Sequence, residues 1–223
     1  MNIPKNRHTQ IFDTKLKILQ QASRFVPFDG WSRSCFIESV QNAEVSLDEA
    51  YFVFPKGARD LAIFFHEYGD TKMLEHLQNE NFEDLSYSEK IAQAVWLRIK
   101  VIESERHLVR RGIAYFSLPQ NFALGTSLIW ATADKIWNFF EDHSEDYNWY
   151  SKRMILSGVI TSALFFYIGD ESEGNMETKF FIDRQIAKVM SFERYKSYAQ
   201  NNPIMSPVFR IMERFIKKPS SKI

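Results

Sequence analysis

The chain of 223 residues carries 28 Lys and Arg against 28 Asp and Glu, with one Cys, eight Gly and seven Pro. Zero net charge argues against a protein that binds nucleic acid over its whole surface, and a single Cys excludes a disulfide framework and a Cys-based zinc site. Because 45% of the residues are hydrophobic, the chain can bury a sizeable core, which excludes an intrinsically disordered protein. The scarcity of Gly and Pro disfavours an all-β sandwich, since that fold needs frequent turns.

Apolar residues at three- and four-residue steps predict three helices near the N-terminus. The first is expected to end at Pro27 and Gly30, and the next two to span residues 32–42 and 47–54. Ser46, with Glu49 three residues later, has the pattern of a capping box that opens the third helix. Three short helices in this order predict a helix-turn-helix-like part over residues 1–57.

The helical pattern continues through the rest of the chain. Further helices are expected over residues 58–77, from Ser86 or Ser88 past residue 102, and over 119–140, 150–168, 179–192 and 204–218. Two uncharged stretches, 112–133 and 154–169, are interpreted as buried helices, because Pro119 interrupts the first and the second is too short to span a bilayer. No alternating run is long enough for a strand. The predicted fold is all-α, with about ten helices.

The catalytic motifs that a helical enzyme would need are missing from the sequence. None of the five His residues has a Glu three positions before it, as a di-iron bundle requires, and there is no His-Glu-x-x-His helix. The loop 169–174 has two Gly residues at the spacing of a phosphate loop, but Asn175 follows it and it carries three acids. We therefore expect no catalytic residues, no cofactor and no metal site.

The segment 45–57 resembles the third helix of a TetR-type helix-turn-helix, which reads the major groove of DNA. Here that helix offers Asp48 and Glu49, and residues 44–60 hold four acids against two cations, a local charge of −2. A surface that faces phosphates should be positive. DNA binding is therefore expected to be absent.

Several motifs in the second half of the chain carry a more specific resemblance. They are Ser-Leu-Pro-Gln-Asn at 117–121, Asp-Lys-Ile-Trp at 134–137, Asp-Tyr-Asn-Trp-Tyr-Ser-Lys-Arg at 146–153, Gly-Asp-Glu-Ser at 169–172 and Phe-Ile-Asp-Arg-Gln-Ile at 181–186. In this order they resemble the ubiquinone-biosynthesis accessory family known as coenzyme Q biosynthesis protein nine, over about 96–190 and more loosely over 30–57. The resemblance implies a TetR-like bundle, a homodimer, and a lipid-binding role without catalysis. It further implies presentation of isoprenoid quinone intermediates to the demethoxyubiquinone hydroxylase.

The resemblance also implies that residues 58–192 form a lipid-binding and dimerisation domain. The residues expected to line its cavity are Phe122, Leu124, Leu128, Ile129, Trp130, Leu156, Val159, Ile160, Ala163, Leu164 and Phe166. An apolar cavity with few polar groups suits a quinone tail. On the residues alone an ordinary dense core is the better interpretation, and the resemblance reverses that preference.

The resemblance also predicts a partner-binding surface, at the segment that begins at residue 148. Large aromatic side chains at a helix start either fill a core or anchor a partner. The family's partner-facing surface includes this motif. The resemblance therefore assigns partner binding to Asp134, Ile136, Trp149 and Tyr150.

The C-terminal residues 203–218 form an amphipathic pattern after an Asn-Asn-Pro linker. Its apolar stripe and basic face suit an anionic membrane surface, and the alternative is a helix that docks back on the bundle. The membrane contacts are expected from Phe209, Arg210, Met212, Arg214, Phe215, Ile216 and Lys217.

The N-terminal residues have no long apolar core and no small-residue cleavage site, so neither a signal peptide nor a mitochondrial presequence is expected. The expected location is therefore the cytoplasm of a bacterium, peripheral on its inner membrane, or the matrix side of the mitochondrial inner membrane for a processed eukaryotic chain. Two alternative functions remain open. One is a TetR-type transcription regulator with a lipid effector, and the other is a helical oxidoreductase subunit, which no cofactor motif supports.

Overall fold

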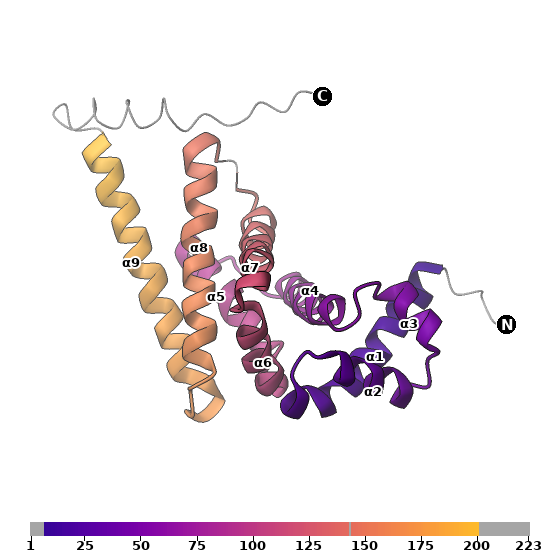
Figure 1. The fold of residues 1–223 in the computed structure, drawn as a ribbon. Helices are drawn as coiled ribbons and strands as arrows, with labels where there is room; N and C mark the ends of the chain where they lie inside the picture. The colour runs from indigo at the N-terminus through magenta and orange to yellow at the C-terminus, as the bar shows by residue number, and fades with distance from the viewer. Residues whose placement is uncertain (1–6, 143, 201–223) are drawn as a thin grey trace, which may run out of the picture. The chain divides into compact units, whose positions relative to one another are not determined.

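The structure, a computed structural model, describes residues 7–142 and 144–200, apart from the side chains of residues 146, 147 and 190–200. Over these residues it consists of helices, with no strand (Figure 1). The predicted all-α class is confirmed. The elements are α1 (Arg7–Asp29), α2 (Arg33–Asn42), α3 (Leu47–Val53), α4 (Ala58–Leu77), α5 (Tyr87–Lys100), the 3-10 turn η1 (Glu103–Glu105), α6 (Arg106–Phe116), α7 (Pro119–Phe139), α8 (Asp146–Tyr167), the 3-10 turn η2 (Glu173–Asn175) and α9 (Met176–Gln200). Among the described helices, none is both long enough and apolar enough to cross a bilayer.

The chain divides into two compact units. Over the described residues, unit 1 comprises 7–73 and 100–128, and unit 2 comprises 74–99 and 129–200. The functional division expected from the sequence, into 1–57, 58–192 and 203–218, stays a prediction. Its last part, with the membrane residues from Phe209 to Lys217, lies outside the described residues.

The core of unit 1 forms between the three N-terminal helices and parts of α4 and α6. Helix α1 buries Ile18, Leu19, Ala22 and Val26, which recur at three- and four-residue steps and so share one face. Trp31, Cys35, Phe36, Phe54, Leu61 and Leu108 pack in the same cluster. The predicted cap of α3 is present, since the Ser46 hydroxyl accepts a hydrogen bond from the Glu49 amide at 3.2 Å.

Helix α1 continues through Pro27 and ends at Asp29, directly before Gly30, the second of the two residues expected to terminate it. The guanidinium of Arg111, in α6, donates to the Pro27 carbonyl at 2.6 and 3.0 Å and to the Phe28 carbonyl at 3.2 Å. Gly30 then ends the helix with a φ of +64°, and its amide donates to the Val26 carbonyl at 2.9 Å. A partner 84 residues away therefore satisfies carbonyl groups at the end of this helix.

The long helix expected from Ser86 past residue 102 is two helices, because α5 ends at Lys100 and α6 begins at Arg106. Its predicted start is correct, since the Ser86 hydroxyl accepts from the Glu89 amide at 3.4 Å and the Glu89 carboxylate accepts from the Ser86 amide at 2.8 Å. Near the end of α5, the charged residue Arg98 is buried, with 4% of its surface exposed.

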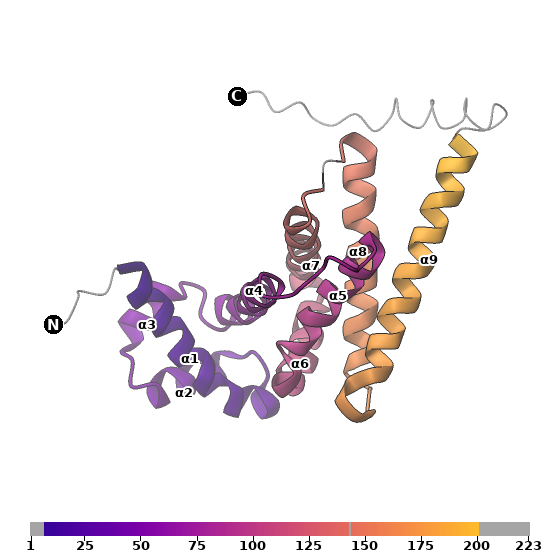
Figure 2. The ribbon, with the colours of Figure 1, turned by 180° about the vertical axis from the view of Figure 1, so that it is seen from behind.

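Helices α8 and α9 run side by side in unit 2 (Figures 1 and 2). Phe166 and Phe181 stack between them, with ring centroids 4.6 Å apart. At their junction Asp170 accepts hydrogen bonds from the amide and hydroxyl groups of both Ser172 and Thr178, at 2.6 to 2.8 Å. Burial raises the pKa of Asp170, but these bonds outweigh it and lower the pKa to about 2. This capping explains why α9 begins at Met176, three residues before the predicted start.

Candidate functional site

A buried arginine organises the start of α8 in unit 2. The side chain of Arg153 is 1% exposed, and its Nε lies 2.5 Å from Oδ1 of Asp134 in α7. Its Nη1 lies 3.3 Å from Oδ2 of Asp142, and its Nη2 donates to the Asn138 side chain at 3.1 Å. The guanidinium carbon lies 3.9 Å from the centroid of the Trp149 ring. One cation thus joins two carboxylates, an amide and an aromatic ring.

Asp142 is the second centre of this network. Its side chain is 3% exposed, and its Oδ1 lies 2.6 Å from Nζ of Lys152, while Oδ2 accepts a hydrogen bond from the Ser144 hydroxyl. Burial raises the pKa of Asp142, but the hydrogen bonds from Lys152, Ser144 and Arg153 outweigh it, so the pKa lies below its ordinary value. The carboxylate is therefore charged at neutral pH, and it fixes the loop between α7 and α8 to the first turns of α8.

Next to this network lies a group of three aromatic side chains in mutual contact, and Trp149 contacts Arg153. We call this group the aromatic patch: Trp130, Trp149 and Tyr150. The ring centroids of Trp149 and Tyr150 lie 4.8 Å apart, and Trp130 lies 6.1 Å from Trp149 and 6.4 Å from Tyr150. All three are half-buried. The guanidinium of Arg153 lies against the Trp149 ring, so the contacts behind the patch restrain the position of that ring.

The structure brings together three of the four residues expected to bind a partner. Trp149 and Tyr150 belong to the aromatic patch, and Asp134 pairs with the arginine behind it. Ile136 is 0% exposed and packs in the core of unit 2. The partner assignment stays a prediction.

The residues expected to line a lipid cavity differ in burial. Leu128, Leu156, Val159, Ile160 and Ala163 are buried, whereas Leu124, Ile129, Trp130, Leu164 and Phe166 are half-buried and Phe122 is 63% exposed. Phe122, Leu124 and Leu128 fall in unit 1, and the others in unit 2. Of the whole set, Phe166 lines a hollow of about 510 Å³ at the junction of α8 and α9, together with Phe165, Gly169, Asp170, Glu171, Ser172 and Glu177. The cavity itself stays a prediction.

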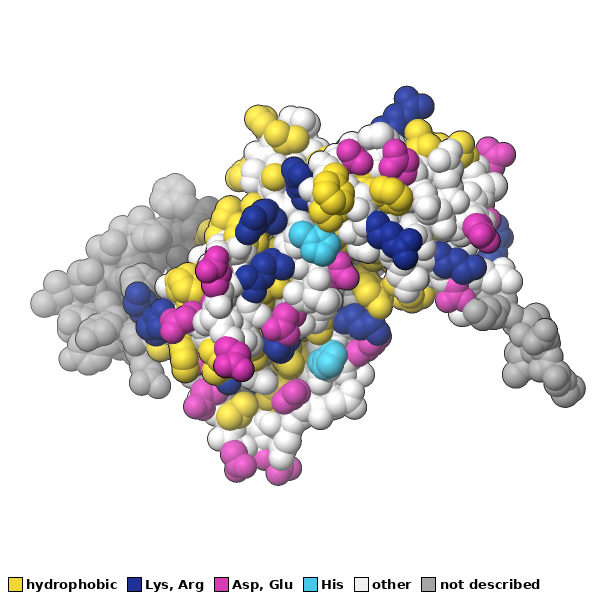
Figure 3. All heavy atoms as spheres, turned by 90° about the horizontal axis from the view of Figure 1, so that it is seen from below, with side chains coloured by type: hydrophobic (Ala, Val, Ile, Leu, Met, Phe, Trp, Pro, Cys, Tyr) yellow, Lys and Arg dark blue, Asp and Glu magenta, His cyan; other side chains and the backbone are white. Residues whose placement is uncertain are grey.

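The third helix of the helix-turn-helix-like part, α3, presents both acids and apolar side chains. Asp48 and Glu49 lie in its first turn, and Leu47 and Phe52 are 43% and 61% exposed. On the molecular face shown in Figure 3, basic and acidic side chains are intermixed, with hydrophobic side chains between them. Neither observation supplies the concentrated positive charge that phosphates attract.

Sequence reasoning missed the residues that support the aromatic patch. Arg153, Asp142 and Lys152 form its charged base, and the Asn138 amide accepts a hydrogen bond from Arg153. Trp130 was assigned to the lipid cavity instead. Two pairs of residues in the sequence have a spacing that could have indicated this network. Trp149 and Arg153 are four residues apart, as are Asp134 and Asn138, so each pair lies on one helical face. Among the described residues, no group of three or more His, Cys, Asp and Glu side chains is arranged to hold a metal ion.

Comparison with known proteins gives consistent matches over most of the chain. Residues 122–193 match the family model described as COQ9. The Ubiquinone biosynthesis protein COQ9, mitochondrial, of Rattus norvegicus is 28% identical over 182 residues, which cover 78% of this chain and 58% of the relative. The protein of the same name from Homo sapiens is 26% identical over 182 residues, covering 78% and 57%. The Probable ubiquinone biosynthesis protein coq9, mitochondrial, of Dictyostelium discoideum is 26% identical over 218 residues, covering 92% and 67%.

A solved structure shares the fold. The crystal structure of the TetR transcriptional regulator from Nitrosomonas europaea ATCC 19718 matches with a TM-score of 0.65 over 78% of this chain and 96% of that chain, at 19% sequence identity. The predicted TetR-like architecture is therefore confirmed. At that identity the match concerns the fold alone. The chain spans just under three fifths of the length of the Rattus norvegicus and Homo sapiens relatives.

Proposed function

This chain resembles the COQ9 family in sequence and a TetR regulator in fold, and from these two facts we propose that it is a non-catalytic, lipid-binding accessory protein of ubiquinone biosynthesis. It binds isoprenoid quinone intermediates and presents them to the demethoxyubiquinone hydroxylase. The names of its relatives support the pathway. The single observation that carries the presenting role is the aromatic patch, fixed from behind by a buried arginine.

The aromatic patch has the properties of an anchor for a protein partner. Trp and Tyr dominate the binding energy of many interfaces, where a few rigid aromatic side chains enter pockets of the partner. Here the rings of Trp149 and Tyr150 lie edge to face, and the ion pairs of Arg153 restrict the helix turn that carries them. A preorganised patch loses little conformational entropy on binding.

The test is capture of purified hydroxylase by the full chain. Tyr150→Lys introduces a charge into the patch and should reduce capture at least about tenfold, the effect expected of a hot spot. Tyr150 is the better position because Trp149 already lies against a buried guanidinium, so a second cation there would disturb the fold. The matched control is Phe52→Lys on α3, where the side chain is 61% exposed. Unchanged capture by the Tyr150→Lys protein would remove the patch from the interface.

Lipid binding rests on the uncharged parts of α7 and α8. The stretch 154–169 contains no charged residue, and Leu156, Val159 and Ile160 bury an apolar face. Burial of an isoprenoid tail in such surroundings gains about 25 cal/mol per Å² of apolar surface. Native mass spectrometry of protein taken from its own host should detect an isoprenoid lipid. A lipid-free mass under gentle conditions would contradict this part of the proposal.

A homodimer is supported by an exposed seam on the helix pair α8–α9. On α8, Met154 and Phe165 are 61% and 53% exposed, with Gly158 and Thr161 between them at helical spacing. On α9, Met176 and Phe180 are 41% and 48% exposed. A second copy covers this seam. Light scattering should report a dimer that Phe165→Glu converts to a monomer, whereas Phe28→Glu, at an 81% exposed position in unit 1, leaves the dimer intact.

The proposed location is a membrane surface, with residues 203–218 as the anchor. Each Lys or Arg near an anionic surface contributes about 1 kcal/mol, so the basic face suffices for reversible attachment. The location is the inner membrane, on the cytoplasmic side in a bacterium or on the matrix side in a mitochondrion. Truncation after Gln200 should lower co-sedimentation with anionic liposomes. Equal sedimentation of the truncated and full chains would reject the anchor.

One alternative function is favoured by a specific observation, the match to a TetR regulator. In that case the chain would bind DNA through α3 and respond to a lipid. The acids Asp48 and Glu49 in the first turn of α3 oppose it. Binding to an operator fragment with micromolar or tighter affinity at moderate salt would favour the regulator over the accessory protein.

A further inference from the structure

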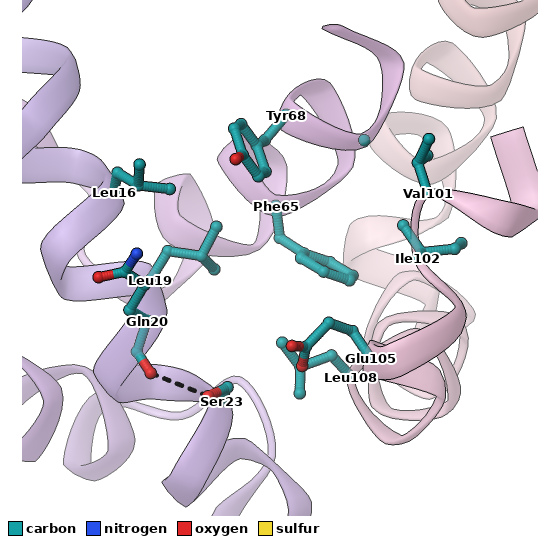
Figure 4. A pocket seen from close by; sticks show the side chains of 11 residues that line it. Leu16, Leu19, Gln20, Ser23, Phe65, Tyr68, Val101, Ile102, Glu105 and Leu108 are labelled. Atoms are coloured by element: carbon teal, nitrogen blue, oxygen red, sulfur yellow. Dashed lines mark hydrogen bonds between the residues drawn. The ribbon is translucent and has the colours of Figure 1, made fainter. Parts of the chain in front are cut away.

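Unit 1 contains a hollow that neither the proposed lipid cavity nor the aromatic patch uses. Its volume is about 260 Å³, and side chains from α1, α4 and the region around η1 surround it (Figure 4). The lining residues are Leu16, Leu19, Gln20, Ser23, Phe65, Tyr68, Gly69, Val101, Ile102, Glu105 and Leu108. In Figure 4 the α1 side chains lie across the hollow from Val101, Ile102, Glu105 and Leu108.

The volume of the hollow and its apolar lining indicate the size and the polarity of the largest part of a ligand. Leu19, Ile102 and Leu108 are buried aliphatic residues, and most of the lining is apolar. An apolar cavity of about 150 Å³ accommodates benzene, so a hollow of about 260 Å³ accommodates a bicyclic aromatic molecule. This volume is too small for a long isoprenoid tail, which separates the hollow from the lipid site proposed above.

The charged residue in the lining indicates which polar group a ligand would carry. Glu105 is the one charged residue among the eleven that line the hollow, and its side chain is 36% exposed. Its Oε2 lies 3.7 Å from Nε2 of His107. Two aromatic rings, of Phe65 and Tyr68, line the same hollow, and Nζ of Lys72 lies over the Tyr68 ring at 5.5 Å from its centroid. A carboxylate beside aromatic rings is the chemistry that recognises an ammonium group.

We propose that this hollow binds a small aromatic amine, with its ring system among Leu16, Leu19 and Phe65 and its protonated amino group at Glu105. The site does not depend on the proposed role in ubiquinone biosynthesis. Its residues belong to unit 1, whereas the aromatic patch and the α8–α9 seam belong to unit 2. Failure of either proposal therefore leaves the other standing.

The test compares three probes with the same ring system on the full chain by calorimetric titration at pH 8. They are naphthylmethylamine, the uncharged naphthylmethanol and the anionic naphthoate. We expect the amine to bind at least about tenfold more tightly than the alcohol, because an ion pair and a cation–π contact are added to the same apolar contacts. Glu105→Gln should remove this preference. The control Glu103→Gln should retain it, since Glu103 lies in the same 3-10 turn, is 35% exposed and pairs with Lys100 outside the hollow.

A second variant tests the position of the ligand. Ser23→Trp should fill the hollow and abolish binding of both the amine and the alcohol, because Ser23 lines it. The hydroxyl that is lost donates to the Gln20 carbonyl of its own helix, at 2.8 Å, so that bond joins no two helices. Val101→Trp fills the same space from the opposite side if the first variant does not fold. Equal affinity for the amine and the alcohol, a preference that survives Glu105→Gln, or no binding of any probe at millimolar concentration would overturn the proposal.

Discussion

Replacing Arg153 by Met removes the charge at the base of the aromatic patch while keeping a side chain of similar length. The guanidinium that is lost pairs with Asp134 and Asp142, donates to Asn138 and lies on Trp149. Breaking a buried ion pair costs about 3–5 kcal/mol when the remaining charge has no other partner.

The structure places the cost near the lower end of that range. Asp142 is 3% exposed but keeps its contacts to Lys152, at 2.6 Å, and to Ser144. Asp134 is 34% exposed, so water solvates it when the arginine is gone. We therefore expect Arg153→Met to lower the free energy of unfolding by about 3 kcal/mol. Lys152→Met, at a 32% exposed position, should lower it by about 1 kcal/mol or less.

Urea unfolding followed by circular dichroism measures both changes, and hydrogen exchange of α8 peptides locates them. The double variant Arg153→Met with Asp142→Asn should be less destabilised than the sum of its single variants, since the two side chains interact. A loss below about 1 kcal/mol for Arg153→Met, or additive effects in the double variant, would refute the view that this network holds the patch.

Three further predictions concern single interactions. Asp170→Asn should destabilise the α8–α9 junction by about 1–2 kcal/mol, and it should remove pH dependence that the parent shows in acid titration. Because the folded pKa of Asp170 is lowered to about 2 from 3.8, its stabilisation is present above pH 4 and is lost as the pH falls through 2. Gly125→Ala should lower the melting temperature, since a Cβ there would lie 2.7 Å from Cβ of Phe116, whereas Gly112→Ala, whose nearest contact is 3.8 Å away, should not. Ser46→Ala should cost about 1 kcal/mol in urea unfolding through loss of the α3 cap, and no change would contradict the capping assignment.

Local chemistry allowed the sequence to predict the helices and two of their starts. Ser46 and Ser86 cap helices through contacts within three residues, so their sequence neighbourhood is sufficient. The hydrogen bonds from Arg111 to the Pro27 carbonyl join residues 84 positions apart, and no local pattern around Pro27 contains that information.

The candidate site was predicted in part for the same reason. The motif at 148–150 identified Trp149 and Tyr150. The role of Arg153, which lies against Trp149, was overlooked, although the two residues are four positions apart in the sequence and so share a helical face. The lipid-facing residues were harder to predict, because a helix without charges gives no sign of which face meets solvent. Phe122, assigned to a cavity wall, is 63% exposed.

The contact between Arg111 and the end of α1 bears on how the nascent chain assembles at the ribosome. Residues 7–73 are synthesised first, residues 74–99 of the other unit follow, and only then does α6 become available. Until that point the carbonyl groups of Pro27 and Phe28 lack the guanidinium that binds them, and the core around Trp31 lacks Leu108. The helix-turn-helix-like part is thus completed after translation has passed residue 111, so a chain that stalls earlier presents an unfinished hydrophobic core to chaperones and proteases.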